Sequence, residues 1–255
     1  MPPKKNIVNI HGLNLTYYTF GAGKPMLFLH GGRVRALTFK KNLELLAKNF
    51  FVIAPDIPGY GFSATPKDVW SFIDYAKFFD YFLSKLDLKN VTVIGYSMGG
   101  GIAYNMAGIS KRLDKVVLIN SSGMNIKVHK VRSDLKRLEF YLTHPKYLHI
   151  FIVLLKEYCL YYIGHIMDLK IINRIRTKCG DTIYDAYKTI KIPTLILWSD
   201  EDWIFPIAVG KRFNQKIPHS KLEIVQGNHD WILYNPILFS QILLKKLTFG
   251  HVSVD

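Results

Sequence analysis

The sequence contains few cysteines, few acidic residues and no long uninterrupted apolar run. Its two cysteines, Cys159 and Cys179, are too few for the disulfide framework of a small secreted protein, and we expect free thiols. No apolar run approaches the roughly 18 residues that cross a bilayer, so the sequence predicts no membrane-spanning helix. The segment after Met1–Lys5 is not continuously apolar, so it predicts no signal peptide and favours a cytoplasmic location.

Acidic residues are outnumbered, with 19 against 34 Lys and Arg, and the net charge is +15. Such a charge is typical of proteins that bind nucleic acid or anionic membranes. Residues 1–123 carry 15 basic and 7 acidic side chains, residues 124–190 carry 12 and 6, and residues 191–255 carry 7 and 6. Because the excess is spread and forms no long basic run, we expect a solvated surface and no nucleic-acid partner. Association of the basic segment 124–190 with a membrane surface is a weaker alternative that stays open.

Short apolar runs alternate with longer helical patterns along most of the chain. The runs predict strands at 26–29, 51–54, 91–94, 116–119, 194–198 and 222–225, and the patterns between them predict helices near 36–49, 70–86, 98–111, 207–217 and 230–247. This alternation is typical of an α/β fold with a mostly parallel sheet covered on both faces. Residues 7–10 and 15–20 flank His11-Gly12-Leu13-Asn14 and predict an antiparallel hairpin at the sheet edge.

The alternation breaks at residues 124–190, which contain no convincing strand. We therefore predict a core made of residues 1–123 and 191–255, with a helical insertion at 124–190. Apolar and aromatic residues recur in the insertion at helical spacing: Tyr147, Phe151, Leu154, Tyr158, Tyr161 and His165. The stripe either packs on a core of its own or covers a ligand pocket as a cap, and the sequence leaves both open.

The strongest local motif is Gly95-Tyr96-Ser97-Met98-Gly99, which stands between a predicted strand and a predicted helix. A Gly-X-Ser-X-Gly in that context is a nucleophile elbow, in which a sharp turn lifts the serine hydroxyl above the sheet. The helix that follows presents free N–H groups, which favour developing negative charge. The motif predicts that Ser97 is a nucleophile.

Further segments at strand ends make the sequence similar to the α/β-hydrolase superfamily. They are His30-Gly31-Gly32, Asp56-Ile57-Pro58-Gly59-Tyr60-Gly61-Phe62-Ser63, the loop Trp198–Pro206, and Gly227-Asn228-His229. The resemblance implies a mostly parallel sheet with helices on both faces and a helical cap, in the esterase- and lipase-like serine-hydrolase branch. The serine at position 97 disfavours the epoxide hydrolase and dehalogenase branches, which place an aspartate there.

A serine hydroxyl needs a base and the base needs an orienting acid. Of the nine histidines, only His30 and His229 directly follow predicted strand ends, and we assign His229 as the base and His30 as a loop buttress. The superfamily's spacing places the acid at Asp202, with Asp200 as the alternative. The other position that the superfamily uses, after the strand at 116–119, carries Asn120 and no carboxylate.

The resemblance places the oxyanion-binding N–H groups on Gly32 and Met98. The loop continues as Arg33-Val34-Arg35, and these arginines either meet an anionic substrate group or are solvated residues at a helix start. We also predict substrate contacts at Tyr96, Arg33, Trp203, Phe151 and Tyr158.

The resulting hypothesis is a carboxylesterase-like serine hydrolase of small to medium, apolar ester substrates, with no metal or organic cofactor. Lactone, amide or carbon–carbon bond hydrolysis, perhydrolysis and acyl transfer on the same triad stay open. So does a slow-turnover, receptor-like protein that mainly binds its ligand.

Overall fold

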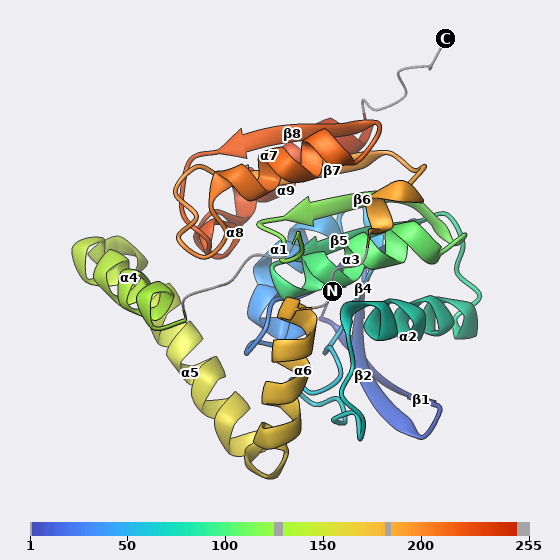
Figure 1. Cartoon of the computed structure of the whole chain (residues 1–255), viewed down its shortest axis with the longest axis horizontal. Helices are drawn as coiled ribbons and strands as arrows, with labels where there is room; N and C mark the ends of the chain where they lie inside the picture. Colours follow the sequence, from blue (N-terminus) through green and yellow to red (C-terminus); the bar gives the residue numbers. More distant parts are fainter. Residues whose placement is uncertain (1, 125–129, 182–184, 249–255) are drawn as a thin grey trace.

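The computed structural model describes residues 2–124, 130–181 and 185–248. An eight-stranded sheet crosses its centre in the order β1-β2-β4-β3-β5-β6-β7-β8 (Figure 1). The strands are β1 (Lys4–Ile10), β2 (Leu13–Phe20), β3 (Lys24–Leu29), β4 (Phe50–Pro55), β5 (Val91–Tyr96), β6 (Leu113–Ile119), β7 (Thr194–Ser199) and β8 (Ser220–Val225). The β1–β2 and β2–β4 pairs are antiparallel, and all other neighbours are parallel. The predicted mostly parallel sheet is therefore confirmed.

Helices cover both faces of the sheet, because the inner strands carry apolar side chains on both sides. The helices of the core are α1 (Lys40–Leu46), α2 (Phe72–Lys85), α3 (Met98–Ile109), α7 (Ile207–Lys216), α8 (Trp231–Tyr234) and α9 (Pro236–Thr248). On β5, Val93 belongs to the apolar cluster shared with α2, α3 and α7. Its neighbour Ile94 belongs to the cluster shared with α1, α8 and α9.

Two predicted elements differ in detail from the structure. The hairpin turn is tighter than the four residues predicted, since only His11 and Gly12 separate β1 from β2. Both have positive φ, 50° and 83°, as tight two-residue hairpin turns require. The helix predicted at 230–247 is split into α8 and α9, because Pro236 has no N–H to continue α8 and disfavours a helical residue before it.

The insertion contains α4 (Lys130–Thr143), α5 (Leu148–Gly164) and α6 (Leu169–Asp181), with short 3-10 turns at Pro145–Tyr147, Ile166–Asp168 and Ala186–Lys188. The part of residues 124–190 that the structure describes contains no strand. In Figure 1, α4 and α5 extend away from the sheet and α6 returns toward it. Leu154, Tyr161 and His165 of the aromatic stripe are buried. The division into core and cap at 123/124 and 190/191 stays a prediction.

The carboxyl ends of the parallel strands meet at one edge of the sheet, where ligands bind in open α/β folds. The side chains that follow these ends include His30 after β3, Asp56 after β4, Ser97 after β5, Asn120 after β6, Asp202 after β7 and His229 after β8.

Candidate active site

Ser97 forms the turn between β5 and α3. Its φ of 54° and ψ of −115° are strained for a residue with a side chain. The Ser97 N–H donates to the carbonyl of Ile119 at 3.0 Å, and its own carbonyl accepts N–H groups from Gly100 at 3.0 Å and Ser122 at 2.9 Å. These hydrogen bonds hold the turn in place at the carboxyl edge of the sheet.

The two glycines of the motif are required by packing around this turn. A Cβ on Gly95 would lie 2.3 Å from the carbonyl oxygen of Gly99. A Cβ on Gly99 would lie 2.2 Å from the carbonyl oxygen of Leu29 on β3. Both distances are shorter than any backbone contact allows, so the spacing of the motif follows from the close approach of α3 to the sheet.

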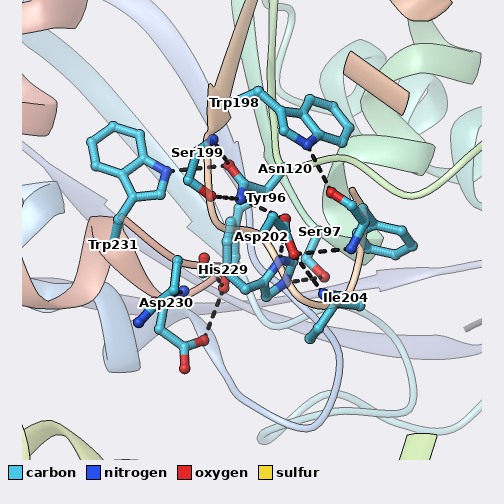
Figure 2. A network of polar contacts seen from close by, with 12 residues as sticks. Tyr96, Ser97, Asn120, Trp198, Ser199, Asp202, Ile204, His229, Asp230 and Trp231 are labelled. Atoms are coloured by element: carbon cyan, nitrogen blue, oxygen red, sulfur yellow. Dashed lines mark hydrogen bonds and ion pairs between the residues drawn. The ribbon is translucent and has the colours of Figure 1, made fainter. Parts of the chain in front are cut away.

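His229 links Ser97 to Asp202 in a single line of hydrogen bonds (Figure 2). Its Nε2 lies 3.1 Å from the Ser97 Oγ, and its Nδ1 lies 2.8 Å from the Asp202 Oδ2. Because an ionised carboxylate only accepts hydrogen bonds, Nδ1 carries the ring proton and Nε2 accepts the serine proton. The structure thus brings together three predicted residues that follow three different strands.

The Asp202 carboxylate is buried and held by further donors. Its Oδ1 accepts the N–H groups of Ile204 at 2.7 Å and Phe205 at 2.9 Å. Its Oδ2 accepts the Nδ2 of Asn120 at 2.6 Å, beside the bond from His229. Hydrogen bonds to the charged form stabilise an ionised, fixed carboxylate.

Asn120 is a supporting residue whose role the sequence analysis missed. Its Nδ2 also donates to the hydroxyl of Ser199 at 2.5 Å, and its Oδ1 accepts the indole N–H of Trp231 at 3.2 Å. Sequence reasoning noted only that the position lacks a carboxylate. The pattern that could have revealed this role is a polar residue directly after a buried strand.

Asp200, the alternative acid, fixes the loop that carries His229. Its Oδ1 accepts the N–H of Gly227 at 2.9 Å, and its own N–H donates to the Val225 carbonyl at 3.0 Å. Gly227 has a φ of 137°, which side chains rarely adopt. Asp200 therefore shapes the backbone before His229, while Asp202 receives the hydrogen bond of the ring.

His30 supports the loop after β3, as predicted. Its Nε2 accepts the N–H of Ile57 at 2.9 Å, and its Nδ1 donates to the carbonyl of Gly31 at 2.7 Å. A neutral ring satisfies both bonds, and burial lowers the pKa of His30 to about 4. The His30 carbonyl also accepts the N–H of Gly99 at 3.0 Å, which ties this loop to the start of α3.

Gly32 and Met98, the predicted oxyanion pair, are neighbours. A Cβ on Gly32 would lie 3.7 Å from the Met98 Sδ and 3.7 Å from the hydroxyl of Tyr60. Tyr60 is almost completely buried, and its hydroxyl has no hydrogen-bond partner among the described residues. Its ring stacks on Tyr161 of α5 with centroids 5.5 Å apart. The aromatic stripe of the cap therefore packs on the core beside the oxyanion loop.

Arg33 and Arg35 fasten the cap to the core, a role that neither alternative of the sequence analysis included. The Arg33 guanidinium lies 3.4 Å from Asp134 of α4. Arg35 makes a bidentate pair with the nearly buried carboxylate of Glu157 on α5, at 3.0 to 3.2 Å. A substrate contact of Arg33 stays a prediction, and its guanidinium is paired with Asp134.

A third cap-to-core ion pair lies next to the base. Arg137 of α4 pairs with Asp230 through Nε at 2.8 Å and through a second nitrogen at 3.0 Å. Both side chains are buried, and the hydroxyl of Tyr141 donates to the same carboxylate at 3.2 Å. No pattern in the sequence predicts this contact, since it joins residues 93 positions apart.

The other residues predicted to contact substrate each have a neighbour within the protein. Tyr96 is buried, and its hydroxyl donates to the carbonyl of His229 at 3.1 Å, which supports the loop of the base. The guanidinium carbon of Arg33 lies 4.8 Å from the centroid of the Tyr158 ring. The Tyr158 hydroxyl accepts a hydrogen bond from Arg137. Trp203 packs against Phe140 with centroids 5.7 Å apart, and Phe151 against Tyr141 at 5.3 Å. Substrate contacts of Tyr96, Tyr158, Trp203 and Phe151 stay predictions, as does that of Arg33.

Within the described residues, no group of three or more His, Cys, Asp or Glu side chains is arranged to hold a metal ion.

Comparisons with known proteins add the family context. A family model described as alpha/beta hydrolase fold matches residues 24–143. An uncharacterized hydrolase of Bacillus subtilis is 27% identical over 242 residues, which are 84% of this chain and 86% of that protein. The 2-hydroxy-6-oxo-6-(2'-aminophenyl)hexa-2,4-dienoic acid hydrolase of Metapseudomonas resinovorans is 23% identical over 90% of this chain and 85% of its own.

Solved structures share the fold. A serine hydrolase involved in carbazole degradation superposes with a TM-score of 0.83 at 22% identity, covering 97% of this chain and 99% of its own.

Proposed function

We propose that this chain, whose fold is that of the α/β hydrolases, is a serine hydrolase that cleaves carboxylic esters of small to medium, apolar substrates. The observation that carries the proposal is the line of hydrogen bonds from the Ser97 hydroxyl through His229 to Asp202. This arrangement is the one that an acyl transfer requires of a nucleophile, its base and the orienting acid.

In the proposed reaction, the Ser97 Oγ attacks the ester carbonyl while the Nε2 of His229 takes its proton. The Asp202 carboxylate stabilises the imidazolium that forms. His229 then gives this proton to the leaving alcohol, and an acyl-enzyme remains on Ser97. A water molecule activated by His229 attacks the acyl group and releases the acid, which restores the hydroxyl.

The negative charge of each tetrahedral intermediate would be met by the N–H groups of Gly32 and Met98. Removing one such donor typically costs about 2.7–4 kcal/mol of the activation barrier. The unpartnered hydroxyl of Tyr60 beside Gly32 is a further donor within the same loop region. We assign it to the substrate's carbonyl or alkoxy oxygen, because a buried donor without a partner is costly unless a ligand uses it.

Chromogenic esters of acetate, butyrate and octanoate test the proposal. We expect steady turnover by the wild type, and a loss of kcat of at least about a thousandfold in Ser97→Ala. Ser84→Ala on α2 is the matched control and should be unchanged. A fluorophosphonate probe should label the wild type and not Ser97→Ala. Failure of the wild type to turn over any ester would contradict the proposal.

The two neighbouring acids provide a second test. Asp202→Asn should lower kcat by about 10⁴-fold, because the amide no longer orients the ring in the required tautomer. Asp200→Asn keeps a carbonyl oxygen that accepts the Gly227 N–H, and should lower kcat less than about tenfold. Equal losses in the two variants would contradict the assignment of the acid.

A second candidate is hydrolysis of a carbon–carbon bond in a substrate that carries a carboxylate. The Metapseudomonas relative is named for a dienoic acid substrate. Arg176 of α6 favours this reading, because it is a half-buried cation on the helix whose Ile172 and Ile175 share an apolar cluster with Tyr60 and Tyr161. For a carbon–carbon bond hydrolase, Arg176→Gln should raise KM for a dienoate substrate and leave KM for a neutral ester unchanged. No turnover of a dienoate would exclude this candidate.

A further inference from the structure

The outward side of α5 is apolar and exposed. Leu154 and Tyr161 mark the buried side of α5, and the exposed apolar residues of this helix lie on its other side. The exposed large apolar residues on α5 and the 3-10 turn after it are Leu148, Ile152, Val153, Leu155, Leu160, Tyr162, Ile163, Ile166 and Met167. We call them the outer cap face. In Figure 1 this helix lies on the side of the molecule away from the sheet.

The exposure increases toward the turn between α5 and α6. Ile163 is 73% exposed, Ile166 is 67% and Met167 is 92%. So many exposed large apolar side chains on one helix and its following turn are typical of an interaction site, because water covers them at a free-energy cost. Helix α5 is apolar on both sides, a pattern that otherwise belongs to buried or membrane-embedded helices.

Basic side chains outnumber acidic ones around the outer cap face, where the acid of the turn, Asp168, accepts a hydrogen bond from Thr65 of the core. Lys156 is the exposed ion on α5, and Lys170 and Arg174 follow on α6. Residues 124–190 contain 12 basic and 6 acidic side chains. Two of those acids, Asp134 and Glu157, are paired with Arg33 and Arg35 of the core, so they do not neutralise the outward side.

From this combination we propose that the outer cap face docks on an anionic lipid bilayer, with the turn at Ile163, Ile166 and Met167 inserted at the interface. Apolar side chains that enter the acyl boundary, flanked by Lys and Arg near the lipid phosphates, are the features of an interfacial helix. A second copy of this chain fits the same face less well. Each copy carries a net charge of +15, so two basic caps would repel each other.

The attachment of α5 to the core sets its orientation in the membrane. By length and composition alone, Pro145–Gly164 could cross a bilayer, and it is the one such helix among the described residues. Its inner side, however, holds the Glu157–Arg35 pair and the Tyr161–Tyr60 stack. A helix held in this way lies along the interface, with its outer side in lipid and its inner side on the protein.

Vesicle flotation tests the proposal, with vesicles of phosphatidylcholine alone and of equal parts phosphatidylcholine and phosphatidylglycerol. We expect the wild type to float with the anionic vesicles, and binding to fall as salt is added. The triple variant Ile163→Gln/Ile166→Gln/Met167→Gln keeps the net charge and should reduce partitioning at least about tenfold.

The matched control is Ile7→Gln/Ile224→Gln/Ile237→Gln, which changes residues 64%, 54% and 57% exposed on β1, β8 and α9. It should float like the wild type. Met167→Gln alone, at the most exposed of these side chains, should weaken binding without any effect on folding. Ser97→Ala should float normally, so this result does not depend on the proposed reaction.

Three results would overturn the proposal. One is equal flotation of the wild type and the outer-face variant. Another is no flotation of the wild type with anionic vesicles. The third is a dimer in light scattering that the outer-face variant abolishes, with no vesicle binding, which would assign the face to a second copy.

Discussion

The buried pair of Arg137 and Asp230 yields a quantitative prediction. Arg137 is 6% exposed and Asp230 is 1%, so Arg137→Met leaves a carboxylate in a site that water does not reach. Breaking a buried pair in this way typically costs about 3–5 kcal/mol. Because Tyr141 still donates to Asp230, we expect about 3 kcal/mol less free energy of unfolding at pH 8.

The pH dependence of this loss identifies its cause. Burial acts to raise the pKa of Asp230, but Arg137 and the other donors outweigh it and hold the pKa below its usual value. In the wild type the pair therefore stabilises the fold above pH 4, near the unfolded pKa, and the contribution disappears as pH falls through the lower folded pKa. In Arg137→Met burial prevails and raises the pKa, so the variant loses stability as pH rises through that value.

Urea unfolding of the wild type and of Arg137→Met at pH 5 and pH 8 measures this difference. The gap between them should be larger at pH 8 than at pH 5. The double variant Arg137→Met/Asp230→Asn should recover most of the loss, because a neutral amide is less costly to bury. A gap below about 0.5 kcal/mol, or an equal gap at both pH values, would refute the reasoning.

Two further predictions concern Asn120 and His30. Asn120→Ala should lower kcat/KM by about 10- to 100-fold, because it removes a charge-assisted hydrogen bond to Asp202. Steady-state ester hydrolysis measures this effect, and an unchanged kcat/KM would refute the supporting role. The free energy of unfolding should fall by roughly 3 kcal/mol between pH 7 and 4, because the unfolded chain protonates His30 near pH 6.5 while the folded pKa is about 4. In His30→Gln this decline should be absent from urea titrations, and a decline of unchanged size would assign it to other groups.

The core of the fold was predictable because its signals are local. Buried parallel strands are continuous apolar runs, and each is followed by a turn that carries polar residues to the same edge. Ser97, Asp202 and His229 could be selected for this reason, from the motifs next to strand ends. The split of α8 from α9 could also have been predicted, since Pro236 stands within the helix predicted at 230–247.

The contacts between cap and core could not be predicted in the same way. Arg33, Arg35 and Arg137 find their acids across 101, 122 and 93 positions of sequence. Nothing in the spacing of these residues specifies where the cap helices lie on the core. The role of Asn120 was missed because an amide that supports a carboxylate has no sequence pattern of its own.

The three cap-to-core ion pairs differ in how far dissolved salt reaches them. Asp134, the partner of Arg33, has a side chain 46% exposed, whereas Arg137 and Asp230 are 8% and 2% exposed by side chain. Added salt screens the first pair and hardly affects the last. The buried pair therefore keeps the cap attached beside His229 whatever the ionic strength, and the nearly buried Glu157 keeps α5 attached through Arg35.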